Sequence, residues 1–297
     1  MRKFFKARHL RLWLWLCALT LAPLSVHAGE PERLTRDGTL KFSPVFVDEG
    51  RTVVFATHET PNLVALRRWK LADESSERLH PSVTSHQFEP AFTPDGLWHC
   101  YAMSSGSPQL VLVIQDVANN KSVEYRPRDA RATARNPSFS PAGSRVVFGL
   151  SDAQGHQIAT VNRHGEDLRL LTRSAGTNSW PAYSPDGKQI AFGSSREGDF
   201  EIYVMSADGG EPRRLTHSPG RDMRPAWSPD GRQIAFVTVR DGDSEIYVMD
   251  ADGSNPRNIT RNPDRDDFPA WHPDGKRLVV VSTRAGDCDL YLYSTVP

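Results

Sequence analysis

The chain has 297 residues, of which 38% are hydrophobic and 24% are charged, and its 36 basic side chains balance 36 acidic ones. This composition is typical of a soluble globular protein and argues against a long membrane bundle or a disordered chain.

Residues 1–28 have the three parts of a secretion signal. The segment has five basic residues among its first eleven, continues through the apolar stretch Leu12–Leu24 and ends in the small-x-small pattern Val26-His27-Ala28. The apolar stretch is too short to span a bilayer comfortably. We therefore expect Sec-type export, cleavage after Ala28, and a mature protein that is periplasmic or secreted, without membrane insertion. Its 31 basic and 36 acidic side chains give a net charge of −5, which argues against nucleic acid as a partner.

The chain from residue 44 onward consists of six copies of one unit. The copies begin at prolines separated by 46, 47, 44, 44 and 44 residues, namely Pro44, Pro90, Pro137, Pro181, Pro225 and Pro269. The last three copies share the string Pro-Ala-Tyr/Trp-Ser/His-Pro-Asp-Gly, and the first three are weaker versions of it. Repeats determine an architecture more firmly than local propensity does, so this periodicity decides the fold class.

Each unit predicts four short antiparallel strands. The Ser-Pro-Asp-Gly string has proline at the second position of a type I turn and glycine where a positive φ is needed, so it joins the first strand to the second. The third strand follows at Glu201–Met205, Glu245–Met249 and Asp289–Tyr293. The fourth ends in Leu-Thr or Ile-Thr, and its apolar residue lies ten residues before the next unit's proline.

Four strands in each unit of about 44 residues predict an all-β fold, a six-bladed β-propeller that occupies residues 29–297. The last unit stops after its third strand, while Glu32-Arg33-Leu34-Thr35 stands alone before the first unit. Leu34 also lies ten residues before Pro44. We expect the N-terminal segment, residues 31–36, to be the closing strand that completes the last blade and leaves no free edge.

The repeated strings resemble the WD-like repeat of the TolB propeller family: Pro-Ala-Trp-Ser-Pro-Asp-Gly, Ile-Ala-Phe, Glu-Ile-Tyr-Val-Met and Ala-Asp-Gly. The resemblance covers roughly Pro31 to Tyr293 and is strong from Asn178 onward. It implies a periplasmic propeller like those that act through protein contacts in the Tol–Pal envelope system. TolB proteins also have an N-terminal α/β domain, for which only Gly29 and Glu30 remain here, so we expect a TolB-like propeller without that domain or its contacts.

Residues that recur in every unit are interpreted as the frame of the propeller, because repeated positions meet the same neighbours. An Arg-x-Gly-Asp string precedes each of the last three third strands, which begin with an acidic residue. We expect a polar network that braces the blades at Arg196, Asp199, Glu201, Arg240, Asp243, Glu245, Arg284, Asp287 and Asp289. Calcium is the alternative for such carboxylates, but these spacings match no recognised loop and the ring would spread them among blades.

Residues that vary between units on one face are the candidates for binding. Chain direction places the segments leading into the first strands on the same face as the Arg-x-Gly-Asp loops, around the mouth of the central channel. We expect partner-binding residues there at Phe88, Glu89, Arg135, Trp180, Arg221, Asp222, Arg224, Asp267 and Phe268. Aromatic and arginine side chains are favoured at the centres of protein interfaces. Variable surface loops without a binding role are the alternative.

Three histidines map to the same face as these candidates. His58, His80 and His86, with Glu59 and Glu89 near them, could bind a transition metal. Their irregular spacing favours exposed histidines instead, so we expect no metal and no cofactor.

The sequence carries no recognised catalytic machinery, since it lacks the Gly-x-Ser-x-Gly elbow of serine hydrolases. We expect a monomeric, non-catalytic interaction scaffold whose partner is another envelope protein or a peptide. The alternative is a propeller that binds a small ligand or carbohydrate in its channel, or a metal-dependent hydrolase or lyase. Metal content and the shape of the channel mouth would discriminate between the two.

Overall fold

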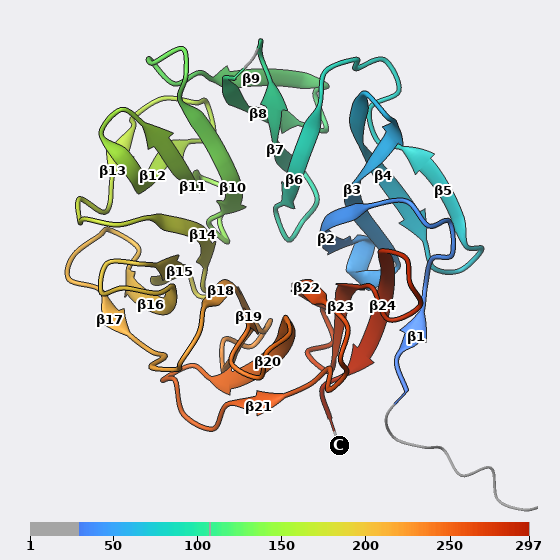
Figure 1. Cartoon of the computed structure of the whole chain (residues 1–297). Helices are drawn as coiled ribbons and strands as arrows, with labels where there is room; N and C mark the ends of the chain where they lie inside the picture. Colours follow the sequence, from blue (N-terminus) through green and yellow to red (C-terminus); the bar gives the residue numbers. More distant parts are fainter. Residues whose placement is uncertain (1–29, 107, 297) are drawn as a thin grey trace, which may run out of the picture.

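The computed structural model describes residues 30–106 and 108–296, so the expected secretion signal and its cleavage site lie outside the described residues. The described chain contains 24 strands and one short 3₁₀ helix, η1 (Asp48–Gly50), which confirms the expected all-β class. The sheets are arranged around a central space in a propeller-like manner (Figure 1). Within the described part of the chain, no helix has the length and apolar character needed to cross a membrane.

The strands follow the sequence repeats closely. The first repeat forms β2 (Lys41–Val47), β3 (Thr52–Thr60), β4 (Leu63–Lys70) and β5 (Ser75–Arg78). The second and third form β6 (Gln87–Phe92), β7 (Trp98–Ser104), β8 (Leu110–Asp116), β9 (Lys121–Tyr125), β10 (Thr133–Phe139), β11 (Arg145–Asp152), β12 (Gly155–Asn162) and β13 (Arg169–Leu170). The fourth and fifth form β14 (Asn178–Tyr183), β15 (Gln189–Ser194), β16 (Glu201–Ser206), β17 (Arg213–Arg214), β18 (Asp222–Trp227), β19 (Gln233–Thr238), β20 (Glu245–Asp250) and β21 (Arg257–Asn258). The last forms β22 (Asp266–Trp271), β23 (Arg277–Ser282) and β24 (Asp289–Ser294).

Five sheets contain all of these strands. Four of the sheets have four strands each, and one has eight. The eight-stranded sheet consists of the second and third repeats, whose antiparallel strand sets are joined by one parallel pair, Leu110 opposite Thr133. The first strands, β2, β6, β10, β14, β18 and β22, lie innermost around the central space (Figure 1).

The N-terminal segment lies at the outer edge of the sheet formed by the last repeat (Figure 1). β1 (Glu32–Arg33) pairs antiparallel with β24, and the N–H of Leu34 donates to the Leu290 carbonyl at 2.8 Å. The buried Leu34 side chain joins a hydrophobic cluster that contains Val279 and Leu290 from the last repeat and Phe46 from the first.

The turn between the first and second strands is held by its own side chains. Ser184 Oγ donates to Asp186 Oδ1 at 2.6 Å and accepts from the Gln189 N–H at 3.0 Å. Ser228 makes the same pair of contacts in the next repeat. In the last repeat His272 takes the place of the serine, and its Nδ1 accepts the backbone N–H two residues further on at 3.1 Å.

The hydrophobic core lies between neighbouring sheet units. Six clusters of buried side chains each join one repeat to the next, including one that joins the last repeat to the first. The indole N–H of Trp227 donates to the Ala182 carbonyl at 3.2 Å, and that of Trp271 donates to Ala226 at 3.0 Å. The repeated Pro-Ala-Trp string therefore links the first strands of neighbouring repeats.

Candidate functional site

Every first strand is irregular at the same place. Its pairing with the second strand skips two residues, which are the repeat's first proline and the residue before it. Proline has no N–H to offer to the ladder, so its exclusion leaves no donor unpaired. The residue before it adopts a left-handed backbone conformation in all six repeats. We call these residues the channel ring: Ser43 (φ 47°), Glu89 (φ 55°), Asn136 (φ 53°), Trp180 (φ 55°), Arg224 (φ 53°) and Phe268 (φ 55°).

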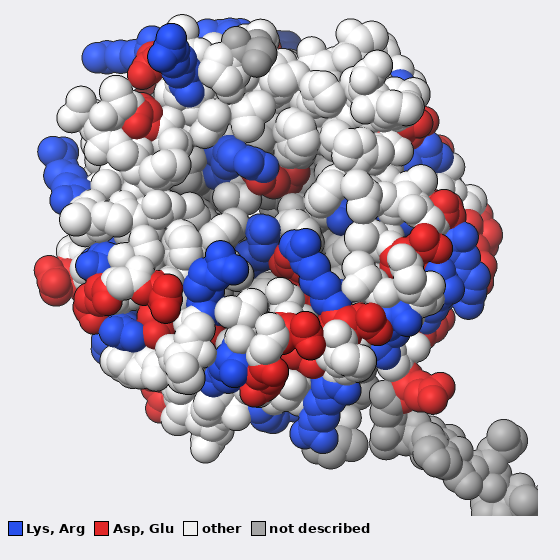
Figure 2. Space-filling model, viewed as in Figure 1, with Lys and Arg blue, Asp and Glu red and all other residues white. Residues whose placement is uncertain are grey.

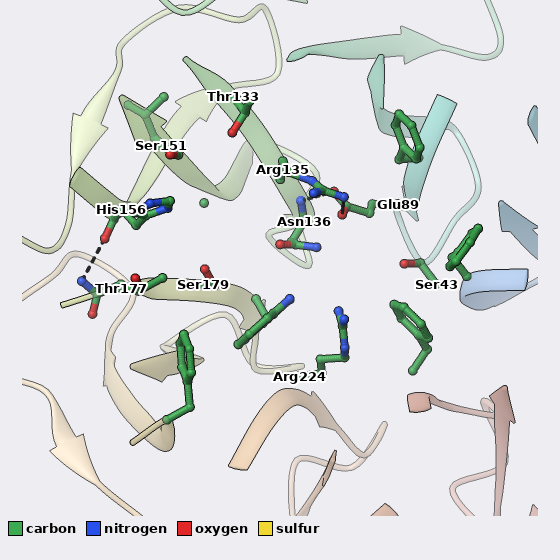
Figure 3. A pocket seen from close by; sticks show the side chains of 18 of the residues that line it. Ser43, Glu89, Thr133, Arg135, Asn136, Ser151, His156, Thr177, Ser179 and Arg224 are labelled. Carbon is green, nitrogen blue, oxygen red and sulfur yellow. Dashed lines mark hydrogen bonds and ion pairs between the residues drawn. The ribbon is translucent and has the colours of Figure 1, made fainter. Parts of the chain in front are cut away.

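The channel ring separates two cavities, because all six of its residues line both. The mouth cavity, on the face where the first strands begin, has a volume of about 570 Å³ and is also bordered by Phe42, Phe88 and Phe200. The opposite cavity, also about 570 Å³, is lined mainly by the repeated prolines and aromatic residues. Figure 3 shows four labelled ring side chains around the mouth cavity, those of Ser43, Glu89, Asn136 and Arg224.

Arg224 is the cation of the channel ring, and its neighbours hold it in one orientation. Its Nε lies 2.9 Å from Asp267 Oδ1. Its guanidinium carbon lies 4.1 Å from the ring centroid of Phe268 and 5.1 Å from that of Trp180, so both rings make cation–π contacts with it. Burial lowers the pKa of Arg224, and the Asp267 carboxylate opposes that shift. The side chain is still 25% exposed, toward the channel.

Glu89 is the anion of the channel ring, and both of its oxygens are engaged. Oε1 accepts from Arg135 Nη2 at 2.6 Å, and Oε2 accepts from the backbone N–H of Asn136 at 2.7 Å. Arg135 also lies over the ring of Phe88, 5.9 Å from its centroid. The Glu89 side chain is only 10% exposed, so it acts chiefly to position Arg135 and the next first strand.

A repeated polar contact ties the third strand to the end of the fourth. Glu201 accepts from Thr216 Oγ1 at 2.5 Å, and that hydroxyl accepts from the Ile202 N–H at 2.9 Å. Thr260 bonds Glu245 in the same way. In the last repeat the contact is made by the N-terminal segment, since Thr35 Oγ1 donates to Asp289 at 2.7 Å and accepts from the next backbone N–H at 3.0 Å.

A family model of the TolB beta propeller domain matches residues 111–224 and 216–296. The chain belongs to this TolB propeller family. No curated protein matches its sequence.

Solved structures share this fold over most of the chain. A protein of Agrobacterium tumefaciens assigned as a TolB is 22% identical, with a TM-score of 0.69 over 89% of this chain and 93% of that one. TolB of Acinetobacter baumannii is 23% identical, with a TM-score of 0.68 over 84% of this chain and 65% of that one. An oligogalacturonate lyase of Vibrio parahaemolyticus is 13% identical, with a TM-score of 0.61 over 89% and 93%. At these identities the likeness shows the fold alone.

In this TolB propeller, six of the nine partner-binding candidates come together around the mouth cavity, namely Phe88, Glu89, Arg135, Trp180, Arg224 and Phe268. The other three do not line it. Arg221 is exposed outside the cavity, and Asp267 is buried beneath Arg224. The assignment of Asp222 to the binding surface is wrong, because its side chain is fully buried and accepts from Arg240 Nη2 at 2.8 Å and from Ser218 at 3.0 Å.

The aspartates of the Arg-x-Gly-Asp strings do not take part in the expected polar network. Asp199, Asp243 and Asp287 are exposed, and within the described chain none of them forms an ion pair with the arginine of its string. The arginines turn inward instead, where each guanidinium carbon lies 4.8–5.5 Å from the centroids of two aromatic rings. Arg196 Nη2 donates to Asn178 at 3.0 Å, and Arg284 bonds the Tyr293 hydroxyl. Arg196 and Arg240 therefore bind the start of their own first strands, and the three aspartates face solvent.

The histidines of the first two repeats do not form a common site. Within the described ranges, no group of three His, Cys, Asp or Glu side chains is placed to hold a metal ion. His58 packs on Phe42, and His86 Nδ1 accepts the Val64 N–H at 3.1 Å. His80 instead pairs with the buried His99, with 3.0 Å between their Nε2 atoms. Burial lowers the pKa of His99 to about 4.

Sequence reasoning selected four of the six channel-ring residues as partner-binding candidates. That set leaves out Ser43 and Asn136 of the ring, and also Phe42 and Phe200, which border the mouth cavity. The available signal was position: each ring residue directly precedes the first proline of its repeat. Phe200 directly precedes the acidic residue of a third strand, and this register places it on the mouth face.

Proposed function

We propose that this protein is an exported TolB-like propeller that acts as a non-catalytic scaffold and binds another envelope protein or a peptide through its channel mouth. The observation that carries this proposal is the channel ring. Six positions share one backbone conformation, while their side chains are Ser, Glu, Asn, Trp, Arg and Phe. A rigid frame with one variable residue per repeat at a shared level suits recognition, because variation there leaves the frame untouched.

The composition of the mouth supports a protein or peptide partner. Trp180, Phe88 and Phe268 are half-buried around the cavity, beside the arginines Arg135 and Arg224. Aromatic and arginine side chains are enriched among residues that dominate protein binding. A stable complex needs roughly 800 Å² on each partner, which one face of a propeller of this size can present.

The architecture that we propose for this scaffold is six blades within residues 29–297, closed by the N-terminal segment. The six clusters of buried side chains support the count of six blades, since each links one repeat to the next and one links the last repeat to the first. The pairing of β1 with β24 and the Thr35–Asp289 contact support the closure, because they reproduce what Thr216 and Glu201 do within a single repeat. We further propose that the protein is monomeric.

Periplasmic or secreted localisation is part of the same proposal. It is supported by the three-part signal pattern of residues 1–28, with cleavage after Ala28. We propose that the mature chain is not inserted into the membrane.

Crosslinking in living cells tests this function. A photoreactive residue is placed at Arg221, which is exposed on the mouth face and lies outside the channel ring, with a matched probe at the exposed Lys188 in the turn on the opposite face. We expect a defined envelope protein to be captured from position 221 and not from 188. Equal capture from both positions, or none from position 221, would reject the mouth as the docking surface.

The mouth cavity also supports a second candidate function, the binding of a small molecule or carbohydrate, with or without catalysis. Its volume of about 570 Å³ falls within the range of small-molecule sites. Metal analysis of the purified mature protein, followed by a turnover screen on acidic oligosaccharides, tests this candidate. Stoichiometric metal or turnover would favour it over the scaffold.

A further inference from the structure

We propose that the channel ring binds a carboxylate group of the incoming ligand, and that Arg224 is the residue that receives it. This inference rests on the proposed function in one respect, since it assigns the ligand chemistry of the same mouth. Its basis is the surroundings of the Arg224 guanidinium. The group contacts Asp267, Phe268 and Trp180, and its two Nη atoms face the mouth cavity.

The guanidinium of Arg224 is held before any ligand arrives. Asp267 engages its Nε at 2.9 Å, and the rings of Phe268 and Trp180 lie at its sides, 4.1 and 5.1 Å from the guanidinium carbon. Asp267 is held in turn by Arg265 Nη2 at 2.7 Å and by the backbone N–H of Phe268 at 2.7 Å. An arginine fixed in this way loses little conformational freedom on binding, which favours affinity.

The two Nη atoms of Arg224 are the unused part of the group. Among the described residues, neither has a hydrogen-bond acceptor, since the contact with Asp267 is made through Nε. Figure 3 shows the Arg224 side chain extending into the mouth cavity toward Asn136. Two parallel N–H groups are the donor pair that a carboxylate accepts in a bidentate manner.

Neutral donors stand near the same space. The side chains of Asn136, Ser43 and Ser179 line the mouth cavity and form no hydrogen bonds with other described side chains. The mouth cavity therefore offers one amide and two hydroxyl groups beside the guanidinium. Their presence suits a ligand that brings further polar atoms next to its carboxylate, as a peptide does.

The charges around the ring favour a singly charged anion. The charged groups that act on Arg224 are Asp267, Glu89, Arg265 and Arg135, and together with Arg224 itself they leave one positive charge in excess. Basic side chains also border the central hollow in the space-filling view (Figure 2). Because both oxygens of Glu89 are already engaged, it is poorly placed to bind a cation. A doubly charged phosphate would be compensated only in part, whereas a carboxylate matches the excess.

The aromatic residues that border the mouth cavity indicate which group of the ligand lies next to its carboxylate. Phe42, Phe88 and Phe200 border the mouth cavity above the ring. Apolar surface beside a charged anchor favours a ligand with an apolar group close to its carboxylate. N-acetylphenylalanine has both parts, and its neutral amide is a matched probe that differs only in the carboxylate.

Ligand-observed saturation-transfer NMR on the mature protein tests the inference. We expect N-acetylphenylalanine to bind at least tenfold more tightly than N-acetylphenylalanine amide, and Arg224→Gln to weaken the carboxylate at least tenfold without weakening the amide. The matched control is Arg232→Gln, an exposed arginine in the turn on the opposite face, which should leave both affinities unchanged. A melting temperature measured for each variant establishes that it is folded.

Two further ligands separate the sources of the carboxylate. N-acetylalanine presents only a chain-terminal carboxylate, and N-acetylaspartate amide presents only a side-chain one. The compound that binds more tightly shows which of these two carboxylates the ligand supplies. Equal binding of acid and amide, tighter binding of inorganic phosphate, or full retention of carboxylate affinity in folded Arg224→Gln would overturn the proposal. Carboxylate binding without crosslinked protein would reject only the scaffold, and crosslinking without carboxylate binding would reject only this inference.

Discussion

At the scale of single residues, Gly50 and His272 show how a change in one repeat is accommodated by another. His272 stands where the third, fourth and fifth repeats have serine, and a Cβ on Gly50 would lie 2.2 Å from its Nε2. Gly50 also has a φ of +87°. A small residue without a side chain is therefore required at position 50 for two reasons, contact and backbone conformation.

Gly50→Ala should lower the free energy of unfolding by about 3 kcal/mol, because it combines a steric clash with a left-handed alanine. In a His272→Ser background, which restores the repeat's usual turn residue, the same change should cost only about 1 kcal/mol. Gly96→Ala is the matched control, since Gly96 has a φ of +68° and nothing within 4 Å of its Cβ position. Urea denaturation of Gly50→Ala, His272→Ser, their double variant and Gly96→Ala gives the free energy of unfolding of each. The difference between the two backgrounds measures the coupling of position 50 to His272. Equal costs in both backgrounds would show that His272 is not the obstacle.

The His80–His99 pair makes stability depend on pH. Burial holds the pKa of His99 at about 4, below its value of about 6.5 in an unfolded chain. The unfolded state therefore binds the proton first, and stability is lost as the pH falls from 6.5 to 4. The shift corresponds to about 3 kcal/mol over this interval.

His99→Gln should remove most of that dependence, since glutamine can keep a hydrogen bond to His80 without titrating. Denaturation at pH 7 and at pH 4.5 measures it, with His164→Gln, an exposed histidine, as the control that should leave the dependence unchanged. An unaltered pH profile in His99→Gln would mean that other groups cause the loss. Asp266 works in the opposite direction, because burial raises its pKa to about 6, so that its ionisation disfavours folding as the pH rises.

At the scale of elements, the pairing of β1 with β24 depends on very few residues. β1 contributes two paired residues, the buried Leu34 side chain and the Thr35 hydroxyl that bonds Asp289. Arg33 and the fully buried Lys41 also bind Asp289, at 2.5 and 3.1 Å. Without this segment, Asp289 loses two of these partners and the edge of β24 is left open.

Deletion of residues 32–35 should lower the melting temperature by roughly 10 °C, from several lost hydrogen bonds and one exposed leucine. Glu32→Ala, a change at an exposed position, should have almost no effect. A synthetic peptide of residues 30–37 added in excess should restore part of the loss, because it binds only the folded state. Calorimetry gives all three values. A deletion variant that melts like the full chain would show that β1 does not close the structure.

The first three strands of each repeat could be predicted from the sequence, and so could the end of the fourth strand, but not how few residues it pairs. The first, second and third strands carry turn chemistry and apolar patterning, and they lie where these signals place them. The fourth strand has only two paired residues in the later repeats, as at β17, because Leu215 and Thr216 continue its contacts outside regular pairing. The inward turn of Arg196 and its homologues was also invisible, since the sequence shows a neighbouring aspartate but not the aromatic rings.

At the scale of the whole molecule, the frame needs the same residues in each repeat, whereas the channel ring allows a different residue in each. The frame repeats Pro-Ala-Trp because each tryptophan bonds the neighbouring first strand, as Trp227 bonds Ala182. The ring accepts any side chain that tolerates a left-handed backbone, a conformation that asparagine adopts more readily than tryptophan, arginine or phenylalanine. Three bulky residues in that conformation add backbone strain that asparagine at the same positions would reduce.

A variant with Trp180, Arg224 and Phe268 all changed to asparagine should separate the two demands. Each change loses some apolar contact, as between Trp180 and Phe200 at 5.1 Å, and relieves about 1 kcal/mol of backbone strain. We therefore expect the triple variant to melt close to the native protein while it loses capture at the mouth. The frame double variant Trp227→Ala and Trp271→Ala should instead lose several kcal/mol, because both indoles are buried and bridge neighbouring sheets. If the ring variant proved the less stable of the two by calorimetry, the ring would belong to the frame, and its chemical variety would need a structural explanation.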